Sequence, residues 1–360
     1  MNSGSKIKKR NPLMKPFTVT GALRSTLAAL CFLACATSLR AADDFLVFEG
    51  KTGPGVGKHI VFLAGDEEYR SEEAMPMMAK ILAVRHGFKC TVLFSVDADG
   101  TINPDNGKSL SNAAALDSAD AIVMLLRFRN WRDEDMKHFV DAYLAGKPII
   151  ALRTSTHAFN ISGGAYKAYS SFGKKVLGEQ WVSHWGNHKS EATRGIIEDA
   201  AKNDPLLKDV VDVFGDTDVY EAYPPADAKI LLRGQVLKGM KPDSPVADYK
   251  KKRSSDKVEQ GINDPMMAVA WSREYKNESG NTNKILCSTM GSATDLQNEG
   301  LRRLVVNGVF WGLGMEVPAK ADVTVVDEFK ATMYGFKSYK KGLKAADYAI
   351  GAKPATEATK

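Results

Sequence analysis

The stretch KPIIALRTSTH (147–157) decides the fold. Its apolar run predicts a buried β-strand over 147–155, and the strand passes directly into a turn of basic and hydroxyl-bearing residues. Strands that are apolar throughout, without polar alternation, are typical of a parallel sheet covered on both faces. The polar turn then lies at the carboxyl end of its strand, which is where open α/β sheets bind their ligands.

Apolar runs on both sides of this stretch predict further strands. They cover residues 59–65 (HIVFLAG), 89–96, 119–128, 227–237, 265–275 and 284–291. Helices are predicted over 72–86, 133–146 and 298–314, each ended by glycine. Strands that alternate with helices predict a doubly wound α/β fold of flavodoxin-like type, with a mostly parallel sheet.

The first 42 residues have the features of a secretory signal peptide. They hold seven basic residues and no acidic residue, followed by the apolar run STLAALCFLACATSL (25–39). We expect cleavage near Ala41 or Ala42 and an exported protein, periplasmic or secreted. Cys35 in FLAC (32–35) offers an alternative as a lipid-attachment site. The run is too short for a comfortable membrane span, and we expect no other span.

The net charge of +6 belongs to this N-terminal segment. Of the 49 basic residues, 42 remain beyond it, against 43 acidic residues. A nearly neutral chain gives no reason to expect nucleic acid or an anionic membrane as a partner. Beyond residue 42 we expect a linker (43–57), an α/β domain (58–318) with a polar insertion loop (238–264), and a C-terminal extension (319–360) with a mobile end.

Two cysteines, Cys90 and Cys287, remain beyond the signal segment. Both lie in predicted apolar strands, so we interpret them as buried thiols. A disulfide between them is the alternative, which their spacing does not decide.

The stretch EQWVSHWGNH (179–188) concentrates two of the six histidines and two of the five tryptophans. Such a composition suits the wall of a binding site better than a core strand or a solvent loop. His184 and His188 are four residues apart and share a face in either a strand or a helix. They could carry acid/base chemistry, or hold a divalent metal with His157 or an acid such as Glu221 as a further ligand.

The turn after residue 152 has the layout of a nucleophile elbow in the class I glutamine amidotransferase-like fold. That pattern has a cysteine where this chain has Arg153. A guanidinium is no nucleophile and stays charged, so we do not expect a glutamine amidotransferase. Arg153 could instead bind a carboxylate, a phosphate or a sugar hydroxyl, with a structural pair to Asp66 or Glu67 as the alternative.

Across roughly residues 58–315 the chain resembles the ThuA (trehalose utilisation) family within that fold. The resemblance is carried by HIVFLAGDEEYR, KPIIALRTSTHAF, VSHWGNH, DVYEAYPPADAKILLRG and PMMAVAWSREY followed by KILCSTMGSATD. Two features depart from the family pattern. Family members commonly place histidine at the elbow and Gly-His in the late turn, where this chain has Arg153 and Gly291-Ser292. His157, four residues past the elbow, is the candidate to replace the first histidine.

The resemblance implies carbohydrate metabolism, with hydrolysis or isomerisation of a 3-keto glycoside or disaccharide supplied by a partner sugar dehydrogenase. A non-catalytic carbohydrate-binding module on the same scaffold is the alternative. Tryptophan faces, including that of Trp181, suit sugar rings, and polar side chains suit hydroxyls. The candidate catalytic residues are His184, His188, His157 and Glu221. The candidate substrate-binding residues are Asp66, Glu67, Arg127, Trp131, Arg153, Ser155, Trp185, Asn187 and Asp295.

Overall fold

The computed structural model describes residues 43–352. The predicted signal peptide, its cleavage point at Ala41 or Ala42, the alternative lipid site at Cys35, and the end of the C-terminal extension (353–360) lie outside the described residues. Within the described range, every helix is too short or too polar to cross a membrane.

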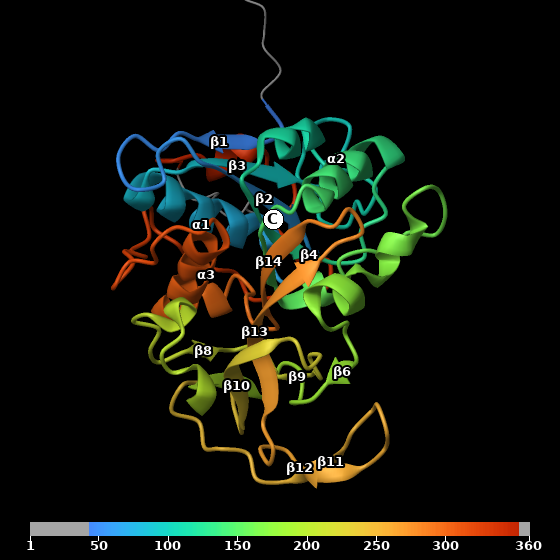
Figure 1. Cartoon of the computed structure of the whole chain (residues 1–360), viewed down its shortest axis with the longest axis vertical. Helices are drawn as coiled ribbons and strands as arrows, with labels where there is room; N and C mark the ends of the chain where they lie inside the picture. The colour runs from blue at the N-terminus through green and yellow to red at the C-terminus, as the bar shows by residue number, and fades with distance from the viewer. Residues whose placement is uncertain (1–42, 353–360) are drawn as a thin grey trace, which may run out of the picture. The chain divides into compact units, whose positions relative to one another are not determined.

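A ten-stranded sheet forms the centre of the fold (Figure 1). Its five central strands run parallel in the order β3-β2-β4-β5-β14, the arrangement of flavodoxin-like folds. Their bounds are β2 His59–Gly65, β3 Lys89–Phe94, β4 Ala121–Leu126, β5 Ile149–Leu152 and β14 Thr282–Ser288. The order reverses between β2 and β4, and that reversal is the usual ligand site of such sheets.

Antiparallel strands extend both edges of the parallel centre. The bounds are β1 Leu46–Phe48 on one side, and β13 Met267–Lys276, β10 Lys229–Leu237, β7 Ala192–Ile197 and β8 Phe214–Gly215 on the other. The predicted linker 43–57 therefore contributes a strand. The link from β13 to β14 spans only 277–281, too short for the crossover that a parallel pair requires.

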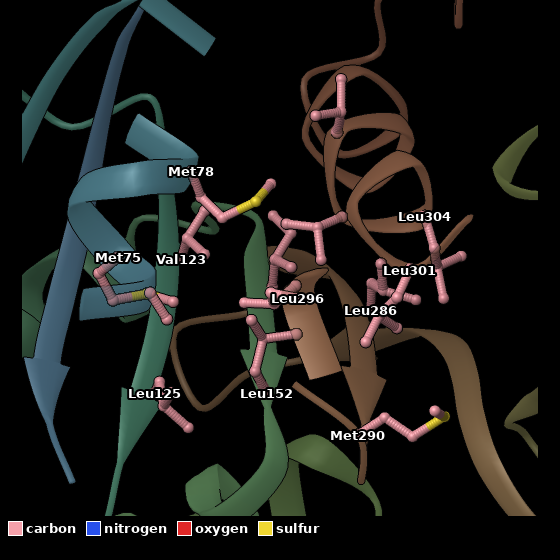
Figure 2. Packing of buried hydrophobic residues seen from close by; sticks show 14 of the residues in the cluster. Met75, Met78, Val123, Leu125, Leu152, Leu286, Met290, Leu296, Leu301 and Leu304 are labelled. Atoms are coloured by element: carbon pink, nitrogen blue, oxygen red, sulfur yellow. The ribbon is translucent and has the colours of Figure 1, made fainter. Parts of the chain in front are cut away.

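Helices cover both faces of the sheet. They are α1 Ser71–His86, α2 Asp133–Leu144 and α3 Glu299–Gly312. Alternate residues of β2 point to opposite faces, so that Phe62 joins the core under α1 and α3, whereas Leu63 joins the core under α2. Figure 2 shows the first of these cores, where Met75 and Met78 of α1 face leucines from the strands and from α3.

Two small antiparallel pairs stand apart from the main sheet. One joins β6 Ser183–His184 to β9 Tyr220–Glu221, and the other joins β11 Lys250–Lys252 to β12 Glu259–Gly261. The second pair is a hairpin inside the predicted insertion loop, so that loop is partly ordered by its own hydrogen bonds.

The C-terminal extension runs along the outer side of α1. Asp327 accepts a hydrogen bond from Lys80 at 2.7 Å, and the Thr332 amide donates to Glu73 at 2.8 Å. Because of this cover, α1 is buried on nearly all of its faces. Cys90 and Cys287 are both buried and free.

Candidate functional site

The loops that follow the parallel strands gather at one edge of the sheet, as the strand pattern predicts. They hold residues 66–70 after β2, 127–129 after β4, 153–157 after β5 and 290–295 after β14. The β6–β9 pair lies against this edge and places His184 opposite Tyr220. Residues distant in sequence thereby meet around one carboxylate, that of Asp218.

Asp218 is fully buried and organises both histidines of the 179–188 stretch. Its Oδ2 lies 2.8 Å from His184 Nδ1, and its Oδ1 lies 3.0 Å from His188 Nδ1. Arg153 Nη2 donates to the same Oδ1 at 2.9 Å. Burial acts to raise the pKa of Asp218, but the guanidinium and the two imidazoles outweigh it and hold that pKa well below its usual range.

Arg153 sits at the elbow in the left-handed region, with φ of 43°. Its fully buried guanidinium lies 4.7 Å from the ring centre of Tyr69 and 3.8 Å from that of Tyr220. It also donates to the carbonyls of Asp218 and Thr289, both at 2.7 Å. The expected substrate contact is therefore corrected, because a fully buried Arg153 holds Asp218 in place and has no surface for a ligand.

His188 lies between two carboxylates. Besides Asp218, the Oε1 of buried Glu68 is 3.1 Å from His188 Nε2, an ion-pair distance without hydrogen-bond alignment. Interaction with Asp218 and then Glu68 raises the pKa of His188 to about 9. His188 is therefore an imidazolium at neutral pH, fixed on both sides.

Of the two imidazoles that contact Asp218, His184 is the one with a ring nitrogen available to a ligand. Its side chain is 37% exposed, and only its Nδ1 has a hydrogen-bond partner within residues 43–352. An ionised carboxylate only accepts hydrogen bonds, so Nδ1 carries the proton toward Asp218 and a neutral His184 has its lone pair on Nε2. That nitrogen is suited to take a proton from a ligand.

His157 lies on the other side of an exposed indole. Its ring centre is 6.0 Å from that of Trp181 and 5.0 Å from that of Phe128. Burial, followed by the charge of Arg127, lowers the pKa of His157 to about 3. His157 is thus neutral at physiological pH and can hydrogen-bond to a ligand, but it is a weak base.

A continuous series of aromatic contacts, which we call the aromatic rim, surrounds this chemistry. Trp181 lies 5.6 Å from His184, His184 lies 4.6 Å from His188, and His188 lies 5.7 Å from Tyr334, measured between ring centres. Beyond His157, the guanidinium of Arg127 extends the series by lying over the Phe128 and Phe336 rings at 4.8 and 4.9 Å. The members of the aromatic rim are Phe128, His157, Trp181, His184, His188, Tyr334 and Phe336.

Exposure singles out the aromatic rim. Phe128, Trp181 and Phe336 are 44%, 40% and 56% exposed, and they are the exposed Phe and Trp side chains of the described chain. Exposed large aromatic side chains gathered at one place indicate a binding surface.

The sugar contacts expected of Trp185 and Trp131 are wrong, because both side chains are buried. Trp185 is fully buried and donates its indole N–H to the Ile262 carbonyl at 2.8 Å. Trp131 packs edge-on against Phe139 and Phe159 in the core under α2. Neither indole has a face available to a sugar, whereas Trp181 does.

Three expected polar contacts are also buried and serve the loops instead. Asp66 accepts hydrogen bonds from two backbone amides of its own loop and from the hydroxyl of Thr154. Ser155 forms hydrogen bonds with two backbone groups of β4. Asp295 accepts hydrogen bonds from the backbone amides of residues 217, 291 and 292. Each of these residues ties one strand-end loop to its neighbour, and none offers an atom to a ligand.

Glu221 is an anchor for the insertion. Its carboxylate accepts hydrogen bonds from the Ser254 and Ser255 amides and from the hydroxyls of Ser183 and Tyr223. Burial opposes ionisation, but these hydrogen bonds outweigh it and lower the pKa of Glu221 to about 2. A carboxylate so strongly ionised and fully occupied is poorly suited to the expected acid/base role.

Glu67 and Arg127 remain close to the aromatic rim and form an ion pair with each other, and Arg129 lies 3.7 Å from the same carboxylate. Asn187 is exposed and donates to the hydroxyl of Tyr249 at 3.3 Å.

Donor atoms of His184, His188 and Asp218 lie within 4.8 Å of one another, the spacing that a metal ion would need. The surroundings oppose a dication, because the guanidinium of Arg153 already lies 2.9 Å from Asp218 Oδ1. Neither further ligand suggested by the sequence joins the group: His157 is not among the three residues whose donor atoms meet, and Glu221 is occupied by hydrogen bonds. We therefore derive no chemistry through a metal.

The structure adds functional residues that the sequence interpretation did not select. Asp218 and Glu68 lie close in sequence to acids that the sequence analysis predicts for the site, Glu221 for the first and Asp66 and Glu67 for the second. The sequence does not distinguish between neighbouring acids, because their burial and hydrogen bonds depend on the fold. Tyr334 and Phe336 come from the C-terminal extension, where no local pattern marks them.

No family model matches the sequence, and no curated protein sequence matches it. Among solved structures, the chain is similar to a protein described as ThuA-like from Bacteroides uniformis ATCC 8492, with 12% identity and a TM-score of 0.43, over 72% of this chain and 92% of that one. It is also similar to a ThuA-like protein from Parabacteroides merdae ATCC 43184, with 11% identity and a TM-score of 0.46, over 81% and 98%. Neither similarity transfers a function to this chain.

Proposed function

We propose that this protein acts on carbohydrates, hydrolysing or isomerising a 3-keto glycoside or disaccharide by acid/base chemistry centred on His184. The observation that carries the proposal is a half-exposed imidazole, oriented by the buried carboxylate of Asp218, beside an exposed indole. The indole suits the apolar face of a sugar ring, and the imidazole suits proton transfer.

In the proposed reaction, His184 Nε2 takes the proton from the carbon next to the ketone. The electrons of that C–H bond move toward the carbonyl oxygen and form an enolate. The imidazolium of His188, with its ring centre 4.6 Å from that of His184, contributes a fixed positive charge that favours this anion.

In isomerisation, the proton returns to the former carbonyl carbon, and the hydroxyl proton of the deprotonated carbon moves to the former carbonyl oxygen, so that the ketone changes place. In hydrolysis, the enolate electrons return to the ring and expel the glycosidic oxygen from the anomeric carbon. That oxygen takes the proton held by His184, and water then adds across the new double bond, its oxygen to the anomeric carbon and its proton to the carbon first deprotonated.

The substrate class rests on the motif resemblance to the ThuA family and on the exposed aromatic side chains. A 3-keto sugar has to be supplied by an oxidation, so we propose a sugar dehydrogenase as the partner enzyme. We also propose that the protein is exported after cleavage near Ala41 or Ala42, because residues 1–42 have the composition of a signal peptide.

The test is NMR of the protein incubated with trehalose, sucrose and their enzymatically prepared 3-keto forms. We expect new sugar signals with the keto forms, loss of these signals in His184→Ala, and full activity in His138→Ala. His138 is the matched control because it is a partly exposed histidine paired with Asp117 on the surface. An active His184→Ala protein would refute the assigned base.

A non-catalytic carbohydrate-binding module is the second candidate, favoured by the exposed rings of the aromatic rim, which bind sugars without any proton transfer. It predicts that sugar signals broaden with no product and that His184→Ala leaves affinity unchanged. Metal analysis of the purified protein accompanies both tests, and a stoichiometric metal lost in His184→Ala would replace the acid/base assignment.

A further inference from the structure

One segment of the C-terminal extension crosses the edge of the sheet that carries the site. We call residues 332–338 the C-terminal strap. Arg70 donates to the carbonyls of Met333 and Gly335, both at 3.2 Å, and to the hydroxyl of Ser338. The Gly335 amide donates to the Glu68 carbonyl at 2.9 Å. The strap is therefore fastened to the same loop that supplies Glu68 to His188.

The fastening relies on a fully buried guanidinium. Arg70 is 0% exposed and adopts the left-handed conformation, with φ of 59°. Burying an arginine is costly unless hydrogen bonds compensate, and most of its acceptors are carbonyls of the strap and of its own loop. Because the buried guanidinium depends on the Met333 and Gly335 carbonyls, the strap is held in a fixed position.

The fixed strap presents one ring inward and one ring outward. Tyr334 is buried against Tyr69 and His188, with ring centres 5.2 and 5.7 Å apart, and donates to the Asp216 carbonyl at 3.1 Å. Phe336 is 56% exposed, with Arg127 at 4.9 Å and Lys189 at 6.0 Å from its ring centre. Core packing does not explain Phe336, because most of its surface faces solvent.

Trp181 and Phe336 occupy separate parts of the aromatic rim. The contacts that connect them pass through His157, Phe128 and Arg127. From the other side of Trp181, contacts through His184 and His188 reach Tyr334, which lies two residues before Phe336 on the strap. The proton-transfer group His184 contacts the indole directly and is separated from Phe336. One sugar ring on Trp181 would thus place its reacting carbon near His184 and leave Phe336 free for a second ring.

We propose that the C-terminal strap is a wall of the substrate site, with Phe336 as a specificity-determining residue that contacts the second sugar ring of a disaccharide. Arg70 is the positioning residue that holds this wall. The inference rests on the proposed function, since it assigns the parts of the same site.

The test compares Phe336→Ala with Ile350→Ala on two probes, 3-keto-trehalose and 3-keto-glucose. Ile350 is the control, an exposed apolar side chain of the C-terminal extension that lies outside the strap and the aromatic rim. We expect Phe336→Ala to raise KM for the disaccharide about tenfold, equivalent to ~1.4 kcal/mol of binding, with kcat within about twofold. KM for the monosaccharide, and all constants of Ile350→Ala, should stay near those of the unaltered protein.

The outcomes separate this inference from the proposed function. Unaltered protein that neither binds nor converts the keto sugars would overturn the proposed function and this assignment together. An active protein whose Phe336→Ala form keeps its disaccharide KM, or loses both sugars equally, would overturn only the assignment to the second ring.

The role of Arg70 is tested in the same assay. Ser338→Ala and Arg70→Lys should raise the disaccharide KM without lowering kcat, and should speed hydrogen exchange of the Gly335 amide. Faster exchange with an unchanged KM would show that Arg70 is structural and that the strap is not a wall of the site. The Ser338 variant keeps this test valid if Arg70→Lys does not fold, because it removes only one acceptor of the guanidinium.

Discussion

At the scale of single residues, the site depends on one buried ion pair. Asp218 and Arg153 are both inaccessible to solvent, and each is satisfied by the other and by the groups around them. A buried pair of this kind contributes little net stability, but the loss of one partner leaves an uncompensated charge in the core. The same carboxylate orients His184 and His188, so stability and chemistry are joined at this position.

Asp218→Asn should therefore affect both properties. We expect the free energy of unfolding to fall by about 3–5 kcal/mol, because the Arg153 guanidinium loses its counter-charge. Activity on a keto sugar should fall by about a hundredfold or more, because His184 loses the acceptor that sets its tautomer. Urea denaturation and initial rates measure the two effects. Asp243→Asn, at an exposed acid, is the control and should be neutral.

His188 makes stability depend on pH. Its pKa is about 9 in the folded protein against an ordinary value of 6.5, so folding favours the protonated form. This contribution is fully present below pH 6.5 and is lost as the pH rises through 9. We expect the difference in unfolding free energy between the unaltered protein and His188→Gln to shrink steadily over that interval. A difference that stays constant between pH 6 and 10 would contradict the assignment of an imidazolium.

At the scale of elements, the insertion hairpin is held against the β6–β9 pair by Glu221. Glu221→Gln keeps the shape but replaces one carboxylate oxygen by an NH2 group, so that either the Ser254 or the Ser255 N–H loses its acceptor. We expect a loss of about 1–3 kcal/mol of stability, measured by urea denaturation, and faster exchange of the backbone amide that loses its acceptor. The pH–rate profile should keep its shape, and a lost limb of that profile would restore Glu221 as an acid/base group.

The elements also show what the sequence can predict. β2 coincides with the predicted strand 59–65, because a strand buried on both faces reads as an unbroken apolar run. β7 (ATRGII) escaped prediction because four of its six positions are only partly buried. β6 and β9 are two residues each, too short for any periodicity. The site shares this limit, since His184 follows from composition, whereas Asp218 is recognised only once its partners surround it.

At the scale of the whole molecule, the order of strands decides the state of the two buried cysteines. Cys90 is on β3 and Cys287 is on β14, with β2, β4 and β5 between them. Neighbouring strands are about 4.8 Å apart, so four steps separate the two by about 19 Å. A disulfide needs Cα atoms within about 7 Å, so these thiols remain unpaired in the folded chain even in an oxidising compartment.

This arrangement gives a joint prediction with the proposed export. Protein recovered from an oxidising compartment should have the mass of a chain that begins at residue 42 or 43. Its two thiols should be unreactive toward a thiol reagent in the folded state, because burial raises the pKa of both, and both should react in urea. A mass that retains residues 1–42 would refute the export, whereas a single reactive thiol, or none, in urea would refute the strand order. One sample therefore tests the two claims separately: the mass tests the export, and the thiol reactivity in urea tests the strand order.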